Sequence, residues 1–266
     1  MLELILFIAV LYLFVIRCRS GHPGLKDLQG WGYAHRGLHG NGVPENSMAA
    51  FKAALDHGYG IELDIHLLKD GNLAVIHDSL LNRTTGQSGY VEDLTTAELK
   101  NYCLEGTEET IPEFMDVLTL YNGKAPLIIE LKPHNGNHAA LAEAVCNMMD
   151  SYKGAFCLES FDPRCVAWLK KNRPDIIRGF LTEDFFRSKN DMSDGLRFAL
   201  KHCLTNVMCV PDFVAYKFAD RKGSPSVEIC RKLWKAQGVT WTITSQEDYD
   251  TAVKEGWLPI FEGFQP

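Results

Sequence analysis

The chain has 266 residues, 46% of them hydrophobic, so it can bury a large core, and its length suits either one α/β barrel or two smaller domains. Its formal charge of −7 and the lack of a long lysine or arginine run argue against a nucleic-acid-binding protein, because phosphate backbones are held by clustered cations. The eight cysteines form no C-x-x-C pair, which indicates buried thiols in a reducing compartment rather than disulfides or a zinc site.

The N-terminal segment is strongly apolar. Every residue from 4 to 16 is apolar, and Arg17 and Arg19 follow at once. The run is shorter than the ~20 residues of a spanning helix, and it lacks the basic start and the cleavage site of a secretory signal. We expect residues 1–19 to form a short membrane anchor that inserts through residues 2–16, with an export signal as the alternative. The cations after the run favour a cytoplasmic position for the rest of the chain; the alternative would export it.

Residues 20–30, with their glycines and a proline, are typical of a linker, so the globular domain is expected to span residues 31–266. A short strand is expected at 31–34, a helix at 48–57 and a second strand at 60–66. A strand, a helix and a strand in this order indicate parallel pairing.

The second of these strands carries two acids. Glu62 and Asp64 are two residues apart in an apolar run, so strand geometry points both carboxylates to the same face. Two carboxylates that have lost water repel each other, and a divalent cation removes that conflict. A turn at Asp70-Gly71 and a short apolar run then lead to His77, whose side chain can exchange protons near neutral pH.

Strands and helices continue to alternate after an insertion at about 79–111. Six more strands are expected, at 126–131, 155–160, 176–181, 206–210, 239–243 and 258–261. About eight strands, each mostly followed by a helix, predict an α/β fold of the (β/α)₈ or TIM-barrel type, in which chemistry gathers at the carboxyl ends of the strands. A doubly wound sheet is the alternative, but the chain has no G-x-G-x-x-G or Walker-type loop.

Several short motifs resemble those of the glycerophosphodiester phosphodiesterases over roughly residues 31–266. They are His35-Arg36-Gly37, Pro44-Glu45-Asn46-Ser47, Glu62-Leu63-Asp64, Lys69-Asp70-Gly71, His77-Asp78, Arg83-Thr84-Thr85-Gly86 and Ile129-Glu130-Leu131-Lys132. Their order and spacing carry the resemblance, since each motif alone would be weak. The resemblance implies a TIM barrel that hydrolyses glycerophosphodiesters to sn-glycerol 3-phosphate and an alcohol.

The resemblance also implies roles for individual residues. Positions that match the metal ligands of the family are Glu62, Asp64 and Glu130, which would hold one Ca²⁺ or Mg²⁺ ion. Positions that match its catalytic pair are His35 and His77, which would share general acid and general base roles. Substrate and phosphate contacts are expected from Arg36, Glu45, Lys132, Ser160 and Trp241. Arg36 suits phosphate because a guanidinium binds it with two hydrogen bonds.

The chain departs from the family pattern near its end. Residues 259–266 stand where the family usually has a Thr-Asp-x-Pro ending, and Thr244 stands where an asparagine is common. The sequence therefore does not decide which alcohol the substrate carries. It also does not decide between Ca²⁺ and Mg²⁺, the separate roles of the two histidines or the oligomeric state. One alternative is a lysophospholipase D-like enzyme that acts on membrane lipid, and another is a non-catalytic phosphate- or lipid-binding barrel.

Overall fold

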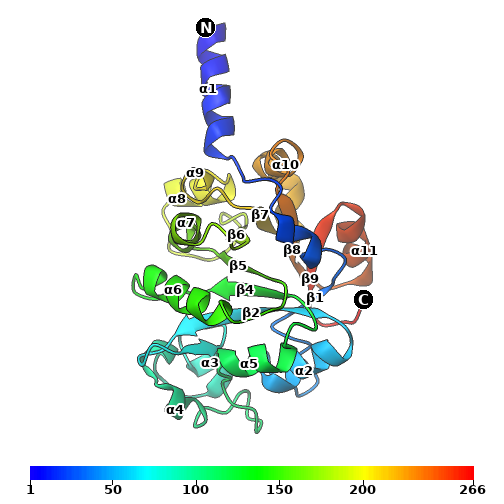
Figure 1. Ribbon diagram of the computed structural model, residues 1–266. Coiled ribbons are helices and arrows are strands. Elements are labelled where there is room, and N and C mark those ends of the chain that lie inside the picture. Colours follow the sequence, from blue (N-terminus) through cyan, green and yellow to red (C-terminus); the bar gives the residue numbers. More distant parts are fainter.

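The computed structural model describes residues 1–266, and its strands form one sheet that closes on itself (Figure 1). Eight strands are parallel to their neighbours, and β1 pairs with both β9 and β2, which closes the barrel. The strands are β1 (Tyr33–His35), β2 (Gly60–Leu67), β3 (Leu73–Val75), β4 (Leu127–Leu131), β5 (Phe156–Ser160), β6 (Arg178–Thr182), β7 (Phe213–Lys217), β8 (Gln237–Ile243) and β9 (Trp257–Phe261).

Helices lie outside the barrel between successive strands (Figure 1). They are α1 (Leu2–Val15), α2 (Met48–Asp56), α3 (Asn82–Thr85), α4 (Thr96–Leu99), α5 (Phe114–Tyr121), α6 (His138–Met149), α7 (Pro163–Asn172), α8 (Asp194–Lys201), α9 (Asn206–Cys209), α10 (Pro225–Lys232) and α11 (Gln246–Lys254), with 3-10 helices η1 (Pro23–Leu28), η2 (Val91–Asp93) and η3 (Phe218–Gly223). The predicted (β/α)₈ barrel is confirmed, and closure through β1 excludes the doubly wound sheet.

One expected strand is wrong. Residues 206–210 form the short helix α9, which ends where Val210 takes a left-handed conformation with φ of 42°. The sixth parallel strand is instead β7, after Pro211 and Asp212. A short apolar run has no clear period, so the sequence pattern does not separate a buried helical turn from a buried strand.

The predicted hairpin and insertion follow β2. Strand β3 pairs antiparallel with β2, with His66 opposite Ala74, so the chain returns toward the end of β2. Residues 79–111 then form η2 and the short helices α3 and α4 around a small hydrophobic cluster of their own. Within this insertion, α4 is only a single helical turn, and η2 precedes it.

Two apolar layers hold the fold together. A large cluster lies between the helices and the outer face of the sheet, and a smaller one fills the inside of the barrel. Tyr33, Ile128, Phe213 and Val239 belong to the inner cluster and come from four different strands. All eight cysteines are free thiols, seven of them buried, as their apolar surroundings predict.

The first 30 residues form two parts that differ in their contact with the barrel. Helix α1 projects from the body with none of its residues buried, and no helix in the structure is long and apolar enough to cross a membrane (Figure 1). Residues 16–30, in contrast, lie against the barrel. Leu28 joins the cluster inside the barrel, and Arg19 contacts the buried Asp212 with Nε 2.5 Å from Oδ1. The segment with a linker-like composition is thus packed on the domain.

Candidate active site

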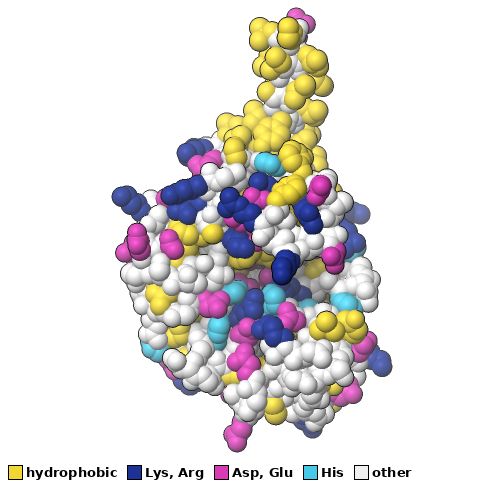
Figure 2. Space-filling model, turned by 180° about the vertical axis from the view of Figure 1, so that it is seen from behind, with side chains coloured by type: hydrophobic (Ala, Val, Ile, Leu, Met, Phe, Trp, Pro, Cys, Tyr) yellow, Lys and Arg dark blue, Asp and Glu magenta, His cyan; other side chains and the backbone are white.

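Charged side chains and histidines gather in the hollow at the mouth of the barrel (Figure 2). They come from the carboxyl ends of β1, β2 and β4 and from the residues that follow β3. Two cavities open there, one of about 130 Å³ and one of about 590 Å³, and His77, Glu130 and Phe161 line both. The mouth is therefore where the sequence-predicted residues meet.

Three carboxylates converge at this mouth. Glu62, Asp64 and Glu130 each offer an oxygen within 4.8 Å of the others, and all three side chains are buried. Strands β2 and β4 pair in parallel with Asp64 opposite Glu130, so both carboxylates lie on the inner face of the barrel. A donor set made only of oxygen atoms suits a hard cation such as Ca²⁺ or Mg²⁺.

The three acids do not share the same proton affinity. Burial, with the charges of Asp64 and Glu130, raises the pKa of Glu62 well above its usual value. Burial also raises the pKa of Glu130 to about 7, although Lys132 opposes this. Asp64 is equally buried, but Lys132, His77 and Arg36 together lower its pKa below the usual value. A divalent cation among the acids would favour the ionised form of all three.

Two cationic side chains lie beside the acids. The Lys132 Nζ atom is 2.9 Å from Glu130 Oε1 and 3.2 Å from Asp64 Oδ1. The Arg36 Nε atom is 3.5 Å from Asp64 Oδ2. Both side chains remain partly exposed, so their free N–H groups can reach a phosphate at the mouth.

His35 ends β1, where the chain turns sharply. Arg36 has a φ of 53° and Gly37 a φ of 82°, and a Cβ atom at Gly37 would lie only 2.8 Å from Ala50. Only glycine avoids that overlap, which explains why this residue type follows His35-Arg36. The turn directs the Arg36 N–H toward Glu62 Oε2 at 3.2 Å.

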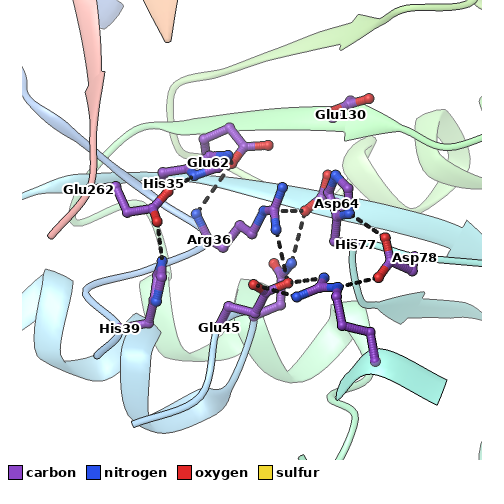
Figure 3. A network of polar contacts seen from close by, with 12 residues as sticks. His35, Arg36, His39, Glu45, Glu62, Asp64, His77, Asp78, Glu130 and Glu262 are labelled. Carbon is purple, nitrogen blue, oxygen red and sulfur yellow. Dashed lines mark hydrogen bonds and ion pairs between the residues drawn. The ribbon is translucent and has the colours of Figure 1, made fainter. Parts of the chain in front are cut away.

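The His35 ring lies between two carboxylates (Figure 3). Its Nδ1 atom is 2.5 Å from Glu262 Oε2, and its Nε2 atom is 3.8 Å from Glu62 Oε2. Because an ionised carboxylate only accepts hydrogen bonds, Nδ1 carries the proton of the short bond. The hydrogen bond from His35 lowers the pKa of Glu262. Nε2 is therefore the nitrogen directed toward the three acids.

His77 approaches the acids from the other side, carried there by the β2–β3 hairpin. The Ile76 N–H donates to the carbonyl of Asp64, and His66 Nε2 lies 3.2 Å from the carbonyl of His77. The His77 Nδ1 atom is 2.7 Å from Asp78 Oδ1. Burial lowers the pKa of His77 to about 4. The side chain is therefore uncharged near neutral pH.

Glu45 binds arginines rather than facing the three acids (Figure 3). It accepts from Arg36 Nη1 at 2.9 Å and from Arg83 Nη2 at 2.6 Å. The next residue, Asn46, donates from Nδ2 to Asp64 Oδ2 at 2.8 Å. The Pro44-Glu45-Asn46-Ser47 loop thus fixes the Arg36 guanidinium and one of the acids.

Comparison with known proteins identifies the family. The sequence model of the glycerophosphoryl diester phosphodiesterase family matches residues 35–261. A glycerophosphodiester phosphodiesterase of Caldanaerobacter subterraneus subsp. tengcongensis is 31% identical over 237 residues, which cover 84% of this chain and 89% of that protein. The chain belongs to the glycerophosphodiester phosphodiesterase family.

Another relative agrees with this assignment, and a solved structure has the same fold. A glycerophosphodiester phosphodiesterase of Bacillus altitudinis is 38% identical over 163 residues, 57% of this chain and 66% of the relative. A phosphodiesterase structure from Oleispira antarctica, in complex with the product sn-glycerol-3-phosphate, superposes with a TM-score of 0.72 at 21% identity. The superposition covers 92% of this chain and 95% of the Oleispira antarctica chain, so the two have the same fold. The predicted family and enzyme class are confirmed.

In this family member, Ser160 and Trp241 occupy different surroundings. The Ser160 side chain is fully buried, and its hydroxyl donates to the Leu131 carbonyl at 2.7 Å. Trp241 lines the 130 Å³ cavity, and its ring packs edge-on against Phe161 with centroids 5.5 Å apart. A substrate contact stays a prediction for both residues, and the geometry offers the indole more readily than the hydroxyl.

The structure adds polar residues to which the sequence argument assigned no role. Glu262 fixes the His35 ring. Arg83 donates to Glu45, and Asn46 donates to Asp64. Glu159 lines the same cavity as the two histidines. Arg83 and Asp78 lie within motifs that carried the resemblance, so a signal for them existed. Glu159 gave a weaker signal, as an acid in an apolar strand directly before Ser160.

Proposed function

We propose that this chain hydrolyses glycerophosphodiesters to sn-glycerol 3-phosphate and an alcohol, with one divalent cation, Ca²⁺ or Mg²⁺. The observation that carries the proposal is the group of three buried carboxylates within 4.8 Å of one another, in a barrel mouth that also holds two histidines. The relative from Oleispira antarctica, which has the same fold, was solved with sn-glycerol-3-phosphate.

The residues present suit a cation in this position. Asp64 Oδ1 is buried and has only the Lys132 ammonium beside it, at 3.2 Å, so it keeps a lone pair for a cation. Glu62, Asp64 and Glu130 would hold the ion, which would supply positive charge to the non-bridging oxygens of the phosphodiester. Arg36 and Lys132 would add two further cationic groups for the same oxygens.

The two histidines divide the proton transfers. The lowered pKa of His77 keeps that ring uncharged near neutral pH, so it begins as the proton acceptor for the attacking hydroxyl. His35, with Nδ1 fixed by Glu262, presents Nε2 toward the three acids and takes part in the other proton transfer of the reaction. Asp78 fixes the His77 ring in the same manner through Nδ1.

The test is hydrolysis of glycerophosphocholine by the full-length protein, followed by release of glycerol 3-phosphate. We expect activity with added Ca²⁺ or Mg²⁺ and none in chelator. His35→Ala and His77→Ala should each lower turnover by about two to four orders of magnitude. Full activity in chelator would reject the role of the cation. Wild-type rates no higher than those of the His35→Ala and His77→Ala double variant would favour a non-catalytic binding protein.

A second candidate is a lysophospholipase D-like reaction on membrane lipid, and one observation favours it. The 590 Å³ cavity next to His77 has an apolar side formed by Leu131, Met192, Leu196 and Leu200. A relative, the rat lysophospholipase D GDPD1, is 34% identical over 133 residues, 45% of this chain. A kcat/KM ratio that favours lysophosphatidylcholine strongly over glycerophosphocholine would select this candidate.

We also propose that α1 binds a membrane and that the catalytic domain is cytoplasmic, with export as the alternative. Most of the helix is apolar and exposed, and only its last turns, through Tyr12, contact the domain, so an aqueous setting leaves most of its side chains unpartnered. Cosedimentation with lipid vesicles should fall when Leu4 and Phe7 are both replaced by glutamate. Protease access to the domain in intact cells separates the two orientations.

A further inference from the structure

Among the residues that line the 130 Å³ cavity, two have a buried polar atom with neither a hydrogen-bond partner nor an ion pair. One is Oε2 of Glu159, whose side chain is 1% exposed, and the other is Nε1 of Trp241. Both residues line the 130 Å³ cavity, together with His35 and His77. Because buried polar groups in native proteins are almost always satisfied, an unpaired acceptor and an unpaired donor in one cavity indicate a ligand that offers both.

Glu159 is separate from the three acids of the proposed cation site. It lies on β5 opposite Glu130 of β4, one strand further round the barrel. The three acids have ligand oxygens within 4.8 Å of one another, and Glu159 is not a member of that group. Its carboxylate is therefore free to meet a part of the substrate that lies beyond the phosphate.

One part of the cavity wall is apolar. The rings of Phe161 and Trp241 meet edge-on, and Leu181 lies in the same cavity lining. A short carbon chain with hydroxyl groups matches this surface, because C–H groups pack on the apolar walls while each hydroxyl both donates and accepts.

A cationic alcohol head group matches the cavity less well. A quaternary ammonium has no acceptor for Trp241 Nε1, and the indole already has the Lys217 ammonium 5.9 Å from its ring centroid. A second phosphate is disfavoured as well, since Glu159 and Glu130 are neighbouring acids.

We propose that Glu159 and Trp241 bind the glycerol half of the substrate, with the Glu159 carboxyl accepting from a glycerol hydroxyl and the Trp241 indole donating to one. The inference rests on the proposed phosphodiesterase function and assigns the 130 Å³ cavity to glycerol. The alcohol half then extends into the 590 Å³ cavity, which shares His77, Glu130 and Phe161 with the smaller one.

The test compares glycerophosphocholine with an analogue that lacks only the terminal hydroxyl, the phosphocholine diester of propane-1,2-diol. The wild type should prefer the glycerol substrate in kcat/KM. Glu159→Leu should lower kcat/KM for the glycerol substrate by about 10- to 100-fold, change it little for the analogue, and so remove the preference. Glu159→Gln keeps an acceptor and should retain most of the preference. Trp241→Phe keeps the apolar wall and should weaken it by a smaller factor, about fivefold.

Three results would overturn the proposal. The first is an unchanged preference in Glu159→Leu. The second is an equal loss on both substrates with weaker Ca²⁺ binding by calorimetry, which would make Glu159 part of the cation site. The third is a changed preference between glycerophosphocholine and glycerophosphomethanol, which would assign Glu159 to the alcohol half.

A separate binding measurement covers the case in which the proposed function itself fails. If the wild type hydrolyses neither diester, sn-glycerol 3-phosphate and propane-1,2-diol phosphate are titrated into wild type and Glu159→Leu. Tighter binding of sn-glycerol 3-phosphate that depends on Glu159 supports the cavity assignment without catalysis, and equal affinities in both proteins overturn it.

Discussion

Replacing Glu62 with glutamine should have opposite effects on stability with and without a divalent cation. Glu62, Asp64 and Glu130 have ligand oxygens within 4.8 Å. Two unit charges at that separation would repel by about 3.5 kcal/mol at an effective dielectric constant near 20. Without a cation Glu62 avoids this repulsion only by taking up a proton, since its pKa is raised well above the usual value, and glutamine removes either cost. Arg36 and Lys132 offset part of this, so we expect Glu62→Gln to raise the free energy of unfolding in chelator by about 1–2 kcal/mol. Glutamine still accepts from the Arg36 N–H, so little else changes.

With cation present the sign should reverse. A ligand that binds only the folded state adds about 2.7 kcal/mol of stability at a concentration 100 times its Kd. The wild type gains this stabilisation from the cation. Glu62→Gln has lost one of three charged ligands, so its free energy of unfolding rises much less when the cation is added. The wild type should then be the more stable protein in saturating Ca²⁺ or Mg²⁺.

The assay is thermal unfolding of both proteins in chelator and in millimolar Ca²⁺ or Mg²⁺. Each kcal/mol corresponds to about 2–4 °C in Tm for a domain of this size. Glu255→Gln is a matched control, because Glu255 pairs with Arg221 away from the mouth. If Glu62→Gln shifts Tm by the same amount and sign in both conditions, the three acids do not bind a cation and the reasoning is refuted.

Two further predictions concern the histidine at β1 and the N-terminal segment. Glu262→Gln removes the charge of the group that accepts the hydrogen bond from His35 Nδ1, so kcat/KM should fall by about 10- to 100-fold with Tm nearly unchanged. Activity within twofold of the wild type would mean that other contacts hold the His35 ring. Asp212→Ala leaves the Arg19 guanidinium and the Arg178 N–H without their buried acceptor. Chemical denaturation should then show a free energy of unfolding lower by about 3–5 kcal/mol. A decrease below about 1 kcal/mol, as expected for the exposed Asp175→Ala control, would show that the contact is not stabilising.

Alternation of strands and helices was enough to predict the barrel. The strands of a parallel barrel are buried on both faces and read as apolar runs, so seven of the eight appear at or within a few residues of their expected positions. The strand prediction at residues 206–210 was wrong because a buried single-turn helix gives the same apolar run as a buried strand. The polar Asp212 also concealed the start of β7. Asp212 is buried because it accepts from Arg19 and Arg178, which no local pattern records.

Spacing along the chain predicted only the acid pair on β2, whereas the resemblance to the family supplied Glu130 and the two histidines. Glu62 and Asp64 share a face through strand periodicity, and pairing of β2 with β4 brings Glu130 to them. Glu262 reaches His35 because β9 closes the barrel against β1, a contact between residues 227 positions apart. Glu159 becomes a neighbour of the histidines only through the closed sheet. Long-range closure, rather than local pattern, decides these positions.

The arrangement of the two cavities constrains the reaction that we propose. Phosphoryl transfer needs the attacking and leaving oxygens roughly in line on opposite sides of phosphorus. His77, Glu130 and Phe161 line both cavities, so the phosphorus belongs at their junction, with glycerol on the Glu159 side and the alcohol on the Leu196 side. Different strands and loops form the two sides: β8 supplies Trp241 to the small cavity, whereas α8 supplies Leu196 and Leu200 to the large one. Changes around α8 can therefore alter which alcohol is accepted while recognition of glycerol stays the same.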